Sequence, residues 1–162
     1  MKCSFIVPVF FILVCFSCAP ALPLIVEEGS DTPLITISVA NPPDTISTEG
    51  LSIKLDYTWN SPRQVFEELQ KAVGGIKYSV TNGKFGGGRH DYGWPVVLDR
   101  LEDSGSLNFF AVNKFGSGSE EGYASGNGRL MYGISCTYKD REGKKHRGAV
   151  SNYLEIPVVF VK

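Results

Sequence analysis

The amino-acid sequence predicts a mainly β protein, an antiparallel β-sandwich of about seven or eight strands with one short helix at about residues 62–73. Three observations carry this prediction. Apolar and polar residues alternate along several short segments, turn residues separate those segments, and one segment changes to helical spacing. The chain has 162 residues, of which 43% are hydrophobic and 20% charged, so it fits one globular domain and excludes wholesale disorder.

The N-terminus carries a predicted signal peptide at residues 1–21. One cation, Lys2, precedes an apolar run at 5–17. That run is shorter than the roughly 20 apolar residues that a membrane-spanning helix needs. Ala19 and Ala21 then place small residues where signal peptidase expects them, for a cut after Ala21.

A second interpretation of the same segment stays open. Val14-Cys15-Phe16-Ser17-Cys18 resembles the lipobox of spirochaete-type bacterial lipoproteins. In that case the signal ends at Ser17, and Cys18 carries a lipid that holds the protein on a membrane. The resemblance implies a membrane-anchored lipoprotein in the periplasm or on the cell surface, whereas a cut after Ala21 implies a secreted soluble protein.

The strand predictions begin after a tether or lead-in at residues 22–32, and the β-sandwich domain is predicted to span 33–162. Apolar residues alternate with polar ones at 35–39 and again at 51–60. Strict alternation places one face of a strand in the core and the other in water. Further strands are predicted at 76–80, 96–101, 106–113, 130–138 and 150–161.

One segment has the spacing of a helix. Ser61 and Pro62 make a capping-box-like start, with proline at the first helical position. Glycines at 74–75 suit a helix C-terminus. The sequence therefore predicts a helix over 62–73, packed on the core by a stripe of apolar residues: Phe66, Leu69 and Val73.

Two of the predicted strands have features that indicate their place in a sheet. Residues 106–113 are apolar on both faces, which predicts a central strand. The last strand, 150–161, contains Pro157, which cannot donate a ladder hydrogen bond and therefore predicts an edge or a bulge.

Some segments are similar to those of fibronectin type III domains. Residues 55–62 (LDYTWNSP) resemble the early tryptophan strand of that family, and 132–138 followed by 151–156 resemble its final hairpin. Residues 110–118 also look like the Ala-Val-Asn-x-x-Gly signature of that hairpin, so two segments compete for one position. The resemblance implies an immunoglobulin/fibronectin III-like sandwich, to which the predicted helix is foreign.

The most unusual stretch is residues 84–95 (KFGGGRHDYGWP), predicted to be a flexible loop. It presents residue types that are common in recognition surfaces. The predicted binding residues are Arg89, His90, Tyr92 and Trp94. In the alternative interpretation, Phe85 and Trp94 pack into the end of the sandwich and hold the loop in place.

Two other readings of residues 84–95 fail on local geometry. A phosphate-binding loop leads into a helix, and Tyr92-Gly93-Trp94-Pro95 does not start one. His90 and Asp91 are neighbours in an extended chain and therefore point to opposite sides, which prevents them from forming a catalytic pair.

Two further loops carry charge. Residues 116–128 are rich in glycine and serine and are predicted to be mobile, and Glu120 and Glu121 lack the spacing of a calcium loop. The turn at 139–147 holds five basic residues. Such charges keep a hairpin tip soluble and protect a sheet edge, or alternatively meet an anionic glycan or lipid headgroup.

Cysteine usage is sparse. Cys3 and Cys15 leave with the signal under either cut, which leaves Cys136 inside the predicted domain and excludes a disulfide framework. Cys136 is in register with Ile134 and Tyr138, so it is predicted to be a buried core thiol.

The formal net charge of −1 argues against a nucleic-acid binder. No catalytic set, metal site or cofactor motif is recognised. The leading hypothesis is an exported, lipid-anchored, non-enzymatic binding module with a protein or glycan partner at the cell envelope. Two alternatives are a secreted hydrolase or lyase using His90, and a purely structural envelope subunit that pairs through the strand at 150–161.

Overall fold

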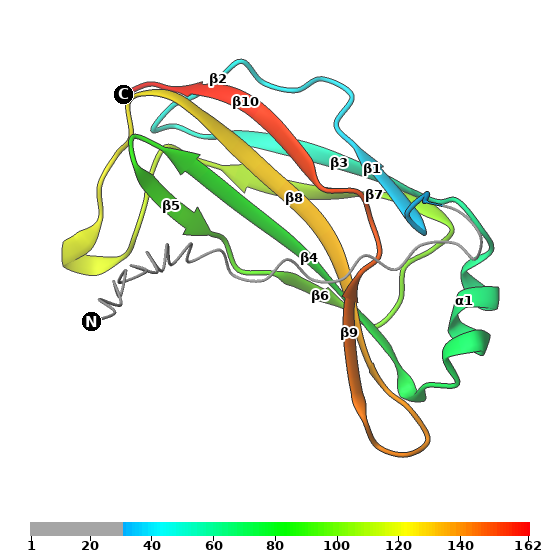
Figure 1. Ribbon diagram of the computed structural model, residues 1–162. Coiled ribbons are helices and arrows are strands. Elements are labelled where there is room, and N and C mark those ends of the chain that lie inside the picture. The colour runs from blue at the N-terminus through cyan, green and yellow to red at the C-terminus, as the bar shows by residue number, and fades with distance from the viewer. Residues whose placement is uncertain (1–30) are drawn as a thin grey trace, which may run out of the picture.

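A computed structural model describes residues 31–162, which fold into two β-sheets and one α-helix (Figure 1). The predictions of a signal peptide and of a lipidated Cys18 fall on residues 1–30 and lie outside this part. The prediction of a mainly β chain with one helix is confirmed. No helix in the described part is long and apolar enough to cross a membrane.

The smaller sheet has three antiparallel strands in the order β1-β3-β7. They are β1 (Ile35–Ser38), β3 (Leu51–Trp59) and β7 (Ser104–Ala111). The period-two pattern of β3 has the predicted consequence: its apolar residues from Ile53 to Trp59 are buried, and the residues between them lie at or near the surface.

The larger sheet has seven strands. Its main path is β2-β10-β8-β4-β5, with β6 paired to β4 and β9 to β8. Among these strand pairs of the described chain, only the short β2–β10 pair is parallel. The strands are β2 (Thr45–Ile46), β4 (Val73–Gly86), β5 (Arg89–Tyr92), β6 (Val96–Leu98), β8 (Gly126–Lys139), β9 (Lys145–Ala149) and β10 (Leu154–Phe160).

The hydrophobic core lies between the inner faces of the two sheets. Aromatic rings meet across this layer: Trp59 of β3 lies 5.8 Å from Tyr78 of β4, and Phe109 of β7 lies 5.4 Å from Tyr132 of β8, between ring centroids. Cys136 is fully buried, as predicted. Burial raises the pKa of its thiol to about 11, which keeps the sulfur protonated and unreactive at neutral pH.

The helix α1 (Arg63–Gln70) is shorter than predicted. Lys71 adopts the left-handed conformation that ends it, no side chain caps its N-terminus, and Val73 already belongs to β4. Of the predicted stripe only Phe66 is buried, against Trp59, whereas Leu69 is 64% exposed. The stripe prediction is wrong because a helix of eight residues meets the core over a single turn.

The position predicted for residues 106–113 is also wrong. Among the described residues the strand there, β7, pairs only with β3 and is therefore an edge strand of the smaller sheet. Phe109 points into the core and Phe110 is 66% exposed on the outer side. The two adjacent phenylalanines thus lie on opposite faces of β7. The face that carries Phe110 is open to solvent, so the strand is not covered on both sides.

Residues 84–95 are not a flexible loop. Most of this stretch is a β-hairpin in which β4 and β5 are joined by Gly87 and Gly88, both with positive φ. Two such residues match the twist of a tight two-residue hairpin, which is why glycine occurs there. The predicted loop is wrong because the glycine run is needed only at the turn, and the flanking residues complete the sheet.

The last strand agrees with the prediction from proline. Pro157 lies in β10 opposite Arg129 of β8, while β2 covers the other side of β10 only at Val159 and Phe160. The missing N–H of Pro157 thus falls where β10 has one strand partner.

Candidate functional site

One group of exposed side chains gathers on the outer face of the larger sheet. We call it the outer aromatic face, formed by Phe85, His90, Tyr92, Arg129 and Tyr153. Residues of β4 with even numbers, such as Tyr78 and Val80, point into the core, so the odd-numbered Phe85 points outward. The strand register then brings His90 of β5 and Arg129 of β8 to either side of Phe85.

The members of this face contact one another. The His90 ring lies 4.4 Å from Tyr92 and 6.1 Å from Phe85, between centroids. The Arg129 guanidinium lies 5.1 Å from the centroid of Phe85 and its Nε lies 3.5 Å from a carboxylate oxygen of Glu155. These contacts hold the rings and the guanidinium in a fixed pattern.

Both tyrosines on this face contact a glycine of the sheet. A Cβ atom at Gly83 would lie 2.9 Å from the Tyr92 ring and 2.9 Å from the methyl group of Met131, so glycine leaves room there. A Cβ atom at Gly133 would lie 3.5 Å from the Tyr153 ring, which is an ordinary contact distance. Met131 points outward, yet it is only 4% exposed. The tyrosine rings therefore lie close against the sheet, and their other sides stay open to solvent.

Tyr92 also lies close enough to Tyr153 to affect the pKa of its hydroxyl group. Burial of its hydroxyl raises the pKa of Tyr153, and the neighbouring Tyr92 and Glu155 raise it further. Because Tyr92 comes from β5 and Tyr153 from the segment before β10, this proximity spans the width of the sheet from β5 to β10.

Trp94 lies beside this face in the connection between β5 and β6. Tyr92 pairs with Gly83 of β4, and Val96 pairs with Val80. The three residues 93–95 therefore lie beside two residues of β4, 81–82, so this connection is one residue longer than the strand segment next to it. Trp94 is 94% exposed. The alternative in which Trp94 packs inward is therefore wrong.

The remaining predicted binding residue, Arg89, belongs to a different environment. A Cβ atom at Gly122 would lie 2.2 Å from the Arg89 guanidinium, which places that group against the 116–128 loop. Asp91 likewise faces away from His90, with its carboxylate 3.6 Å from the ammonium group of Lys84. The structure thus groups His90 with Tyr92 and separates Arg89 and Asp91 from them.

The 116–128 loop is tied to the body of the protein. The buried Asn113 side chain donates to the carbonyls of Ala124 and Val161 and accepts from the Ala124 N–H, at 2.7–2.9 Å. Glu121 pairs with Lys114 at 2.8 Å. Asn113 is not among the residues predicted from the sequence, although its place in the Ala-Val-Asn motif is a signal for a structural role.

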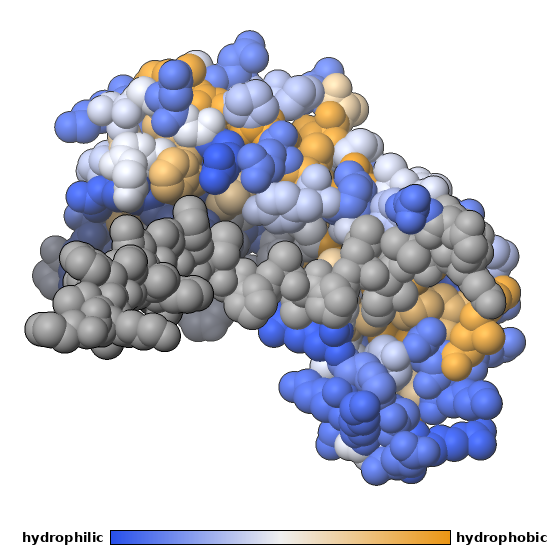
Figure 2. Space-filling model, in the orientation of Figure 1, coloured by the Kyte–Doolittle hydropathy of each residue, from blue (hydrophilic) through white to orange (hydrophobic). Residues whose placement is uncertain are grey.

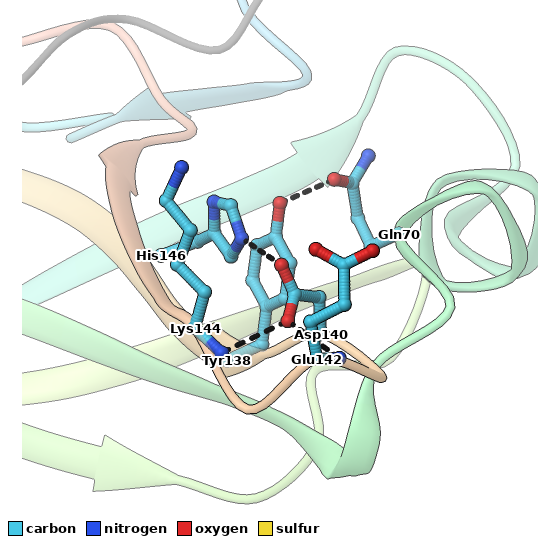
Figure 3. A network of polar contacts seen from close by, with 6 residues as sticks. All are labelled: Gln70, Tyr138, Asp140, Glu142, Lys144 and His146. Carbon is cyan, nitrogen blue, oxygen red and sulfur yellow. Dashed lines mark hydrogen bonds and ion pairs between the residues drawn. The ribbon is translucent and has the colours of Figure 1, made fainter.

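A second candidate region is the tip of the β8–β9 hairpin (Figure 3). Asp140 accepts hydrogen bonds from the backbone N–H groups of Glu142 and Lys144, and its other oxygen lies 2.7 Å from Nε2 of His146. The His146 ring stacks on Tyr138 at 4.9 Å, and the Tyr138 hydroxyl donates to Gln70. These contacts give the tip a defined shape.

The hairpin tip is strongly hydrophilic and projects from the lower part of the molecule (Figure 2). Within the described chain, none of its five lysines and arginines is in an ion pair. Of its two acids, Asp140 is occupied by His146 and by the backbone, and these hydrogen bonds lower the pKa of its carboxyl group. The tip therefore carries a net positive charge that no neighbour neutralises.

Two cavities lie elsewhere. One of about 540 Å³ separates α1 from the β-sheet and is lined by charges of both signs, including the buried Arg63, whose Nε has no hydrogen-bond partner. The other, of about 60 Å³, holds only small molecules and is lined in part by Asn82 and Tyr132. His90 lines neither of them. Residues 31–162 contain no cluster of three histidine, cysteine or acidic side chains that would hold a metal ion.

A scan of the chain against protein-family models finds no match, and a search of curated proteins finds none either.

Proposed function

We propose that this protein is an exported, lipid-anchored, non-enzymatic binding module that meets its partner at the cell envelope through the outer aromatic face and Trp94. The export and the anchor rest on residues 1–21 and on Cys18. A cut after Ala21, which makes a secreted soluble protein, is the alternative.

The observation that carries the proposal is the exposure of large rings beside an arginine. Trp94 and Tyr92 are 94% and 64% exposed, and Arg129 lies on the same face as Tyr92. Tryptophan, tyrosine and arginine are the residue types that contribute most to binding energy at interfaces. Leaving them in water has no benefit for the fold, which is why we assign them to a partner.

We also propose the finer fold assignment, an immunoglobulin/fibronectin III-like sandwich. The strand orders β1-β3-β7 and β2-β10-β8-β4-β5 support it, as does the early tryptophan Trp59 on β3. The pairing of β8 with β10 supports residues 132–138 and 151–156 as the final hairpin. In this arrangement residues 110–118 comprise the last two residues of the edge strand β7 and the first part of its connection to β8.

The hydrolase or lyase alternative needs an acid or nucleophile beside His90. The ring contacts of His90 are with Phe85 and Tyr92, and the carboxylate of Asp91 turns to Lys84. These contacts favour a role for His90 in binding over a role in acid–base chemistry.

The proposal is tested by binding the purified protein to the envelope fraction of the cells that produce it. We expect Tyr92→Ala/Trp94→Ala to lower retention by about tenfold or more, because two large contact residues are lost. The matched control is Phe110→Ala/Val65→Ala, which removes exposed apolar side chains from the smaller sheet and from α1.

Thermal unfolding of each variant separates binding from folding. Equal retention of the wild type and the Tyr92/Trp94 variant contradicts the proposal. So does a loss of several kcal/mol of stability in that variant, because the two rings are then structural. Retention abolished by protease treatment of the envelope identifies a protein partner, and retention abolished by periodate identifies a glycan.

A further inference from the structure

The outer face of the larger sheet continues from the outer aromatic face to the hairpin tip. On β8 the outward residues are odd-numbered, and Lys139 ends this row. Lys145 of β9 lies directly opposite Lys139, and Arg147 lies opposite Thr137. We call Lys139, Lys145 and Arg147 the basic end of the face. All three side chains are exposed.

The positive charges of the basic end repel one another. Lys139 and Lys145 are directly opposed across the two strands, and like charges in that position destabilise a hairpin. Within residues 31–162 no carboxylate lies within ion-pair distance of any of the three. An anion from outside the chain would relieve this repulsion.

The surface between the two regions is neutral and carries hydroxyl groups. The hydroxyl-bearing residues with outward parity there on the central strands β4 and β8 are Ser79, Thr81, Ser135 and Thr137, of which Ser135 is buried. From Met131, beneath the tyrosines, to Lys139 the strand rises by about 27 Å, at about 3.4 Å per residue. Two carboxylates on the strands beside this path, Asp99 and Glu155, are paired with Lys77 and Arg129. An extended anion thus meets no free acid along the way.

We infer that the partner of this face is an acidic polysaccharide, and this inference rests on the proposed function. Its sugar rings would stack on the open sides of Tyr92 and Tyr153, and its carboxylate, sulfate or phosphate groups would pair with the basic end. A tyrosine ring that contacts a glycine of the sheet and is otherwise exposed offers an apolar surface of the kind that the C–H side of a sugar ring requires. The hydroxyl-bearing surface between the two regions suits the polar edges of the intervening sugars.

Two other anions have part of this chemistry. A single-stranded nucleic acid also combines stacking with backbone charge, but its binding proteins use a strongly positive groove, whereas this chain has a net charge of −1. A lipid headgroup would meet the basic tip and leave the tyrosines unused. The experiment below tests both of these partners, a nucleic acid and a lipid surface, as alternatives.

The experiment measures the affinity of the purified full chain for polygalacturonate and for its fully methyl-esterified form, which has the same backbone without the charge. We expect the acid to bind about tenfold or more tightly than the ester, with an affinity that falls as salt is added. Lys145→Ala/Arg147→Ala should lower affinity for the acid about tenfold and leave affinity for the ester unchanged. Tyr92→Ala/Tyr153→Ala should weaken binding to both.

The matched control is Lys54→Ala/Lys162→Ala, which removes the same charge from the smaller sheet and the C-terminus and should bind like the wild type. Equal affinity for acid and ester, no binding to either, or an unchanged Lys145/Arg147 variant overturns the inference. Tighter binding to oligo(dT) or to phosphatidylglycerol vesicles also overturns it, in favour of a nucleic acid or a membrane. The envelope-retention test of the Tyr92/Trp94 variant is independent of these results, so the proposed function can stand when this inference fails.

Discussion

Asn113 shows how one residue can organise a loop that looks mobile from its composition. Its side chain is fully buried and makes three hydrogen bonds to backbone groups of Ala124 and Val161. The glycine-rich segment that follows β7 is thereby joined to the C-terminal end of β10. A buried amide with its partners satisfied stabilises the fold and specifies one loop conformation.

We expect Asn113→Ala to lower the free energy of unfolding by about 3 kcal/mol, because it leaves buried backbone groups without partners. Urea denaturation measures this change. Asn108→Ala, at an exposed position of β7, is the control and should change stability by less than about 0.5 kcal/mol. A loss below about 1 kcal/mol in the Asn113 variant contradicts the structural role.

Asp140 provides a pH-dependent contact at the hairpin tip. Its hydrogen bonds from His146, Lys144 and Glu142 favour the charged form and lower its pKa below the ordinary 3.8. A depressed carboxyl pKa means that the stabilising effect is present above pH 3.8 and is lost as the pH falls through the lowered pKa.

We expect the backbone amide signals of Glu142 and Lys144 to shift together in an NMR titration, with a midpoint below pH 3.8. The amides move because the protonated carboxyl group accepts their hydrogen bonds less strongly. In Asp140→Asn this transition should disappear. A midpoint at or above pH 3.8 contradicts the contact.

At the scale of elements, α1 shows that helical spacing of apolar residues predicts their burial less well than the period-two alternation of a strand does. The stripe of Phe66, Leu69 and Val73 has helical spacing, but only Phe66 reaches the core, through Trp59. Along β3, in contrast, every apolar residue from Ile53 onward at period two is buried. A strand inside a sheet is held by its neighbours on both sides, whereas a helix at the end of a sandwich touches the core where its length allows.

We expect Phe66→Ala to lower the free energy of unfolding by about 3–5 kcal/mol, the range for a buried aromatic ring. Leu69→Ala, from the same predicted stripe, should change it by less than about 0.5 kcal/mol because Leu69 is exposed. Chemical denaturation of the two variants checks this difference. Similar losses in both would mean that the full stripe packs on the core.

The hairpin β4–β5 shows a second limit of local patterns. Three consecutive glycines at 86–88 predict a loop, yet only Gly87 and Gly88 have positive φ. Gly86 belongs to the strand and makes room for the Phe160 ring, which lies 2.4 Å from where its Cβ would be. That reason involves the far end of the chain, so no local pattern reveals it.

At the scale of the whole molecule, charge is unevenly distributed. The chain is nearly neutral, but five of its 16 lysines and arginines lie in the nine residues of the hairpin tip. The tip thus presents a positive end of the larger sheet, and the connection that carries Trp94 lies beside residues 81–82 of β4, away from that end. An unequal distribution of this kind steers an anionic partner into one orientation.

We propose that the location of the whole protein depends on Cys18. We expect the mature protein to carry an acylated N-terminal Cys18, and Cys18→Ser to move it from the membrane fraction to the soluble fraction, because the acyl chains provide the anchoring energy. Mass spectrometry of the mature N-terminus measures the modification. An unmodified protein that begins at Leu22 contradicts the lipid anchor and supports the cut after Ala21.

The sequence by itself determined the elements whose signal is local. Period-two alternation identified the strands around Leu55 and Ile134, and the same pattern predicted a buried Cys136. It also selected Tyr92 and Trp94 as candidate binding residues, because these residue types are common in recognition surfaces.

Only the tertiary structure decided which strands are neighbours and what each face meets. It placed β7 at an edge, separated Arg89 from His90, and brought Arg129 and Tyr153 to Tyr92 from strands distant in sequence. The physical reason is that strand pairing satisfies the same backbone groups whatever the order of strands. The choice among orders follows from packing between segments far apart in the chain, which a local pattern does not record.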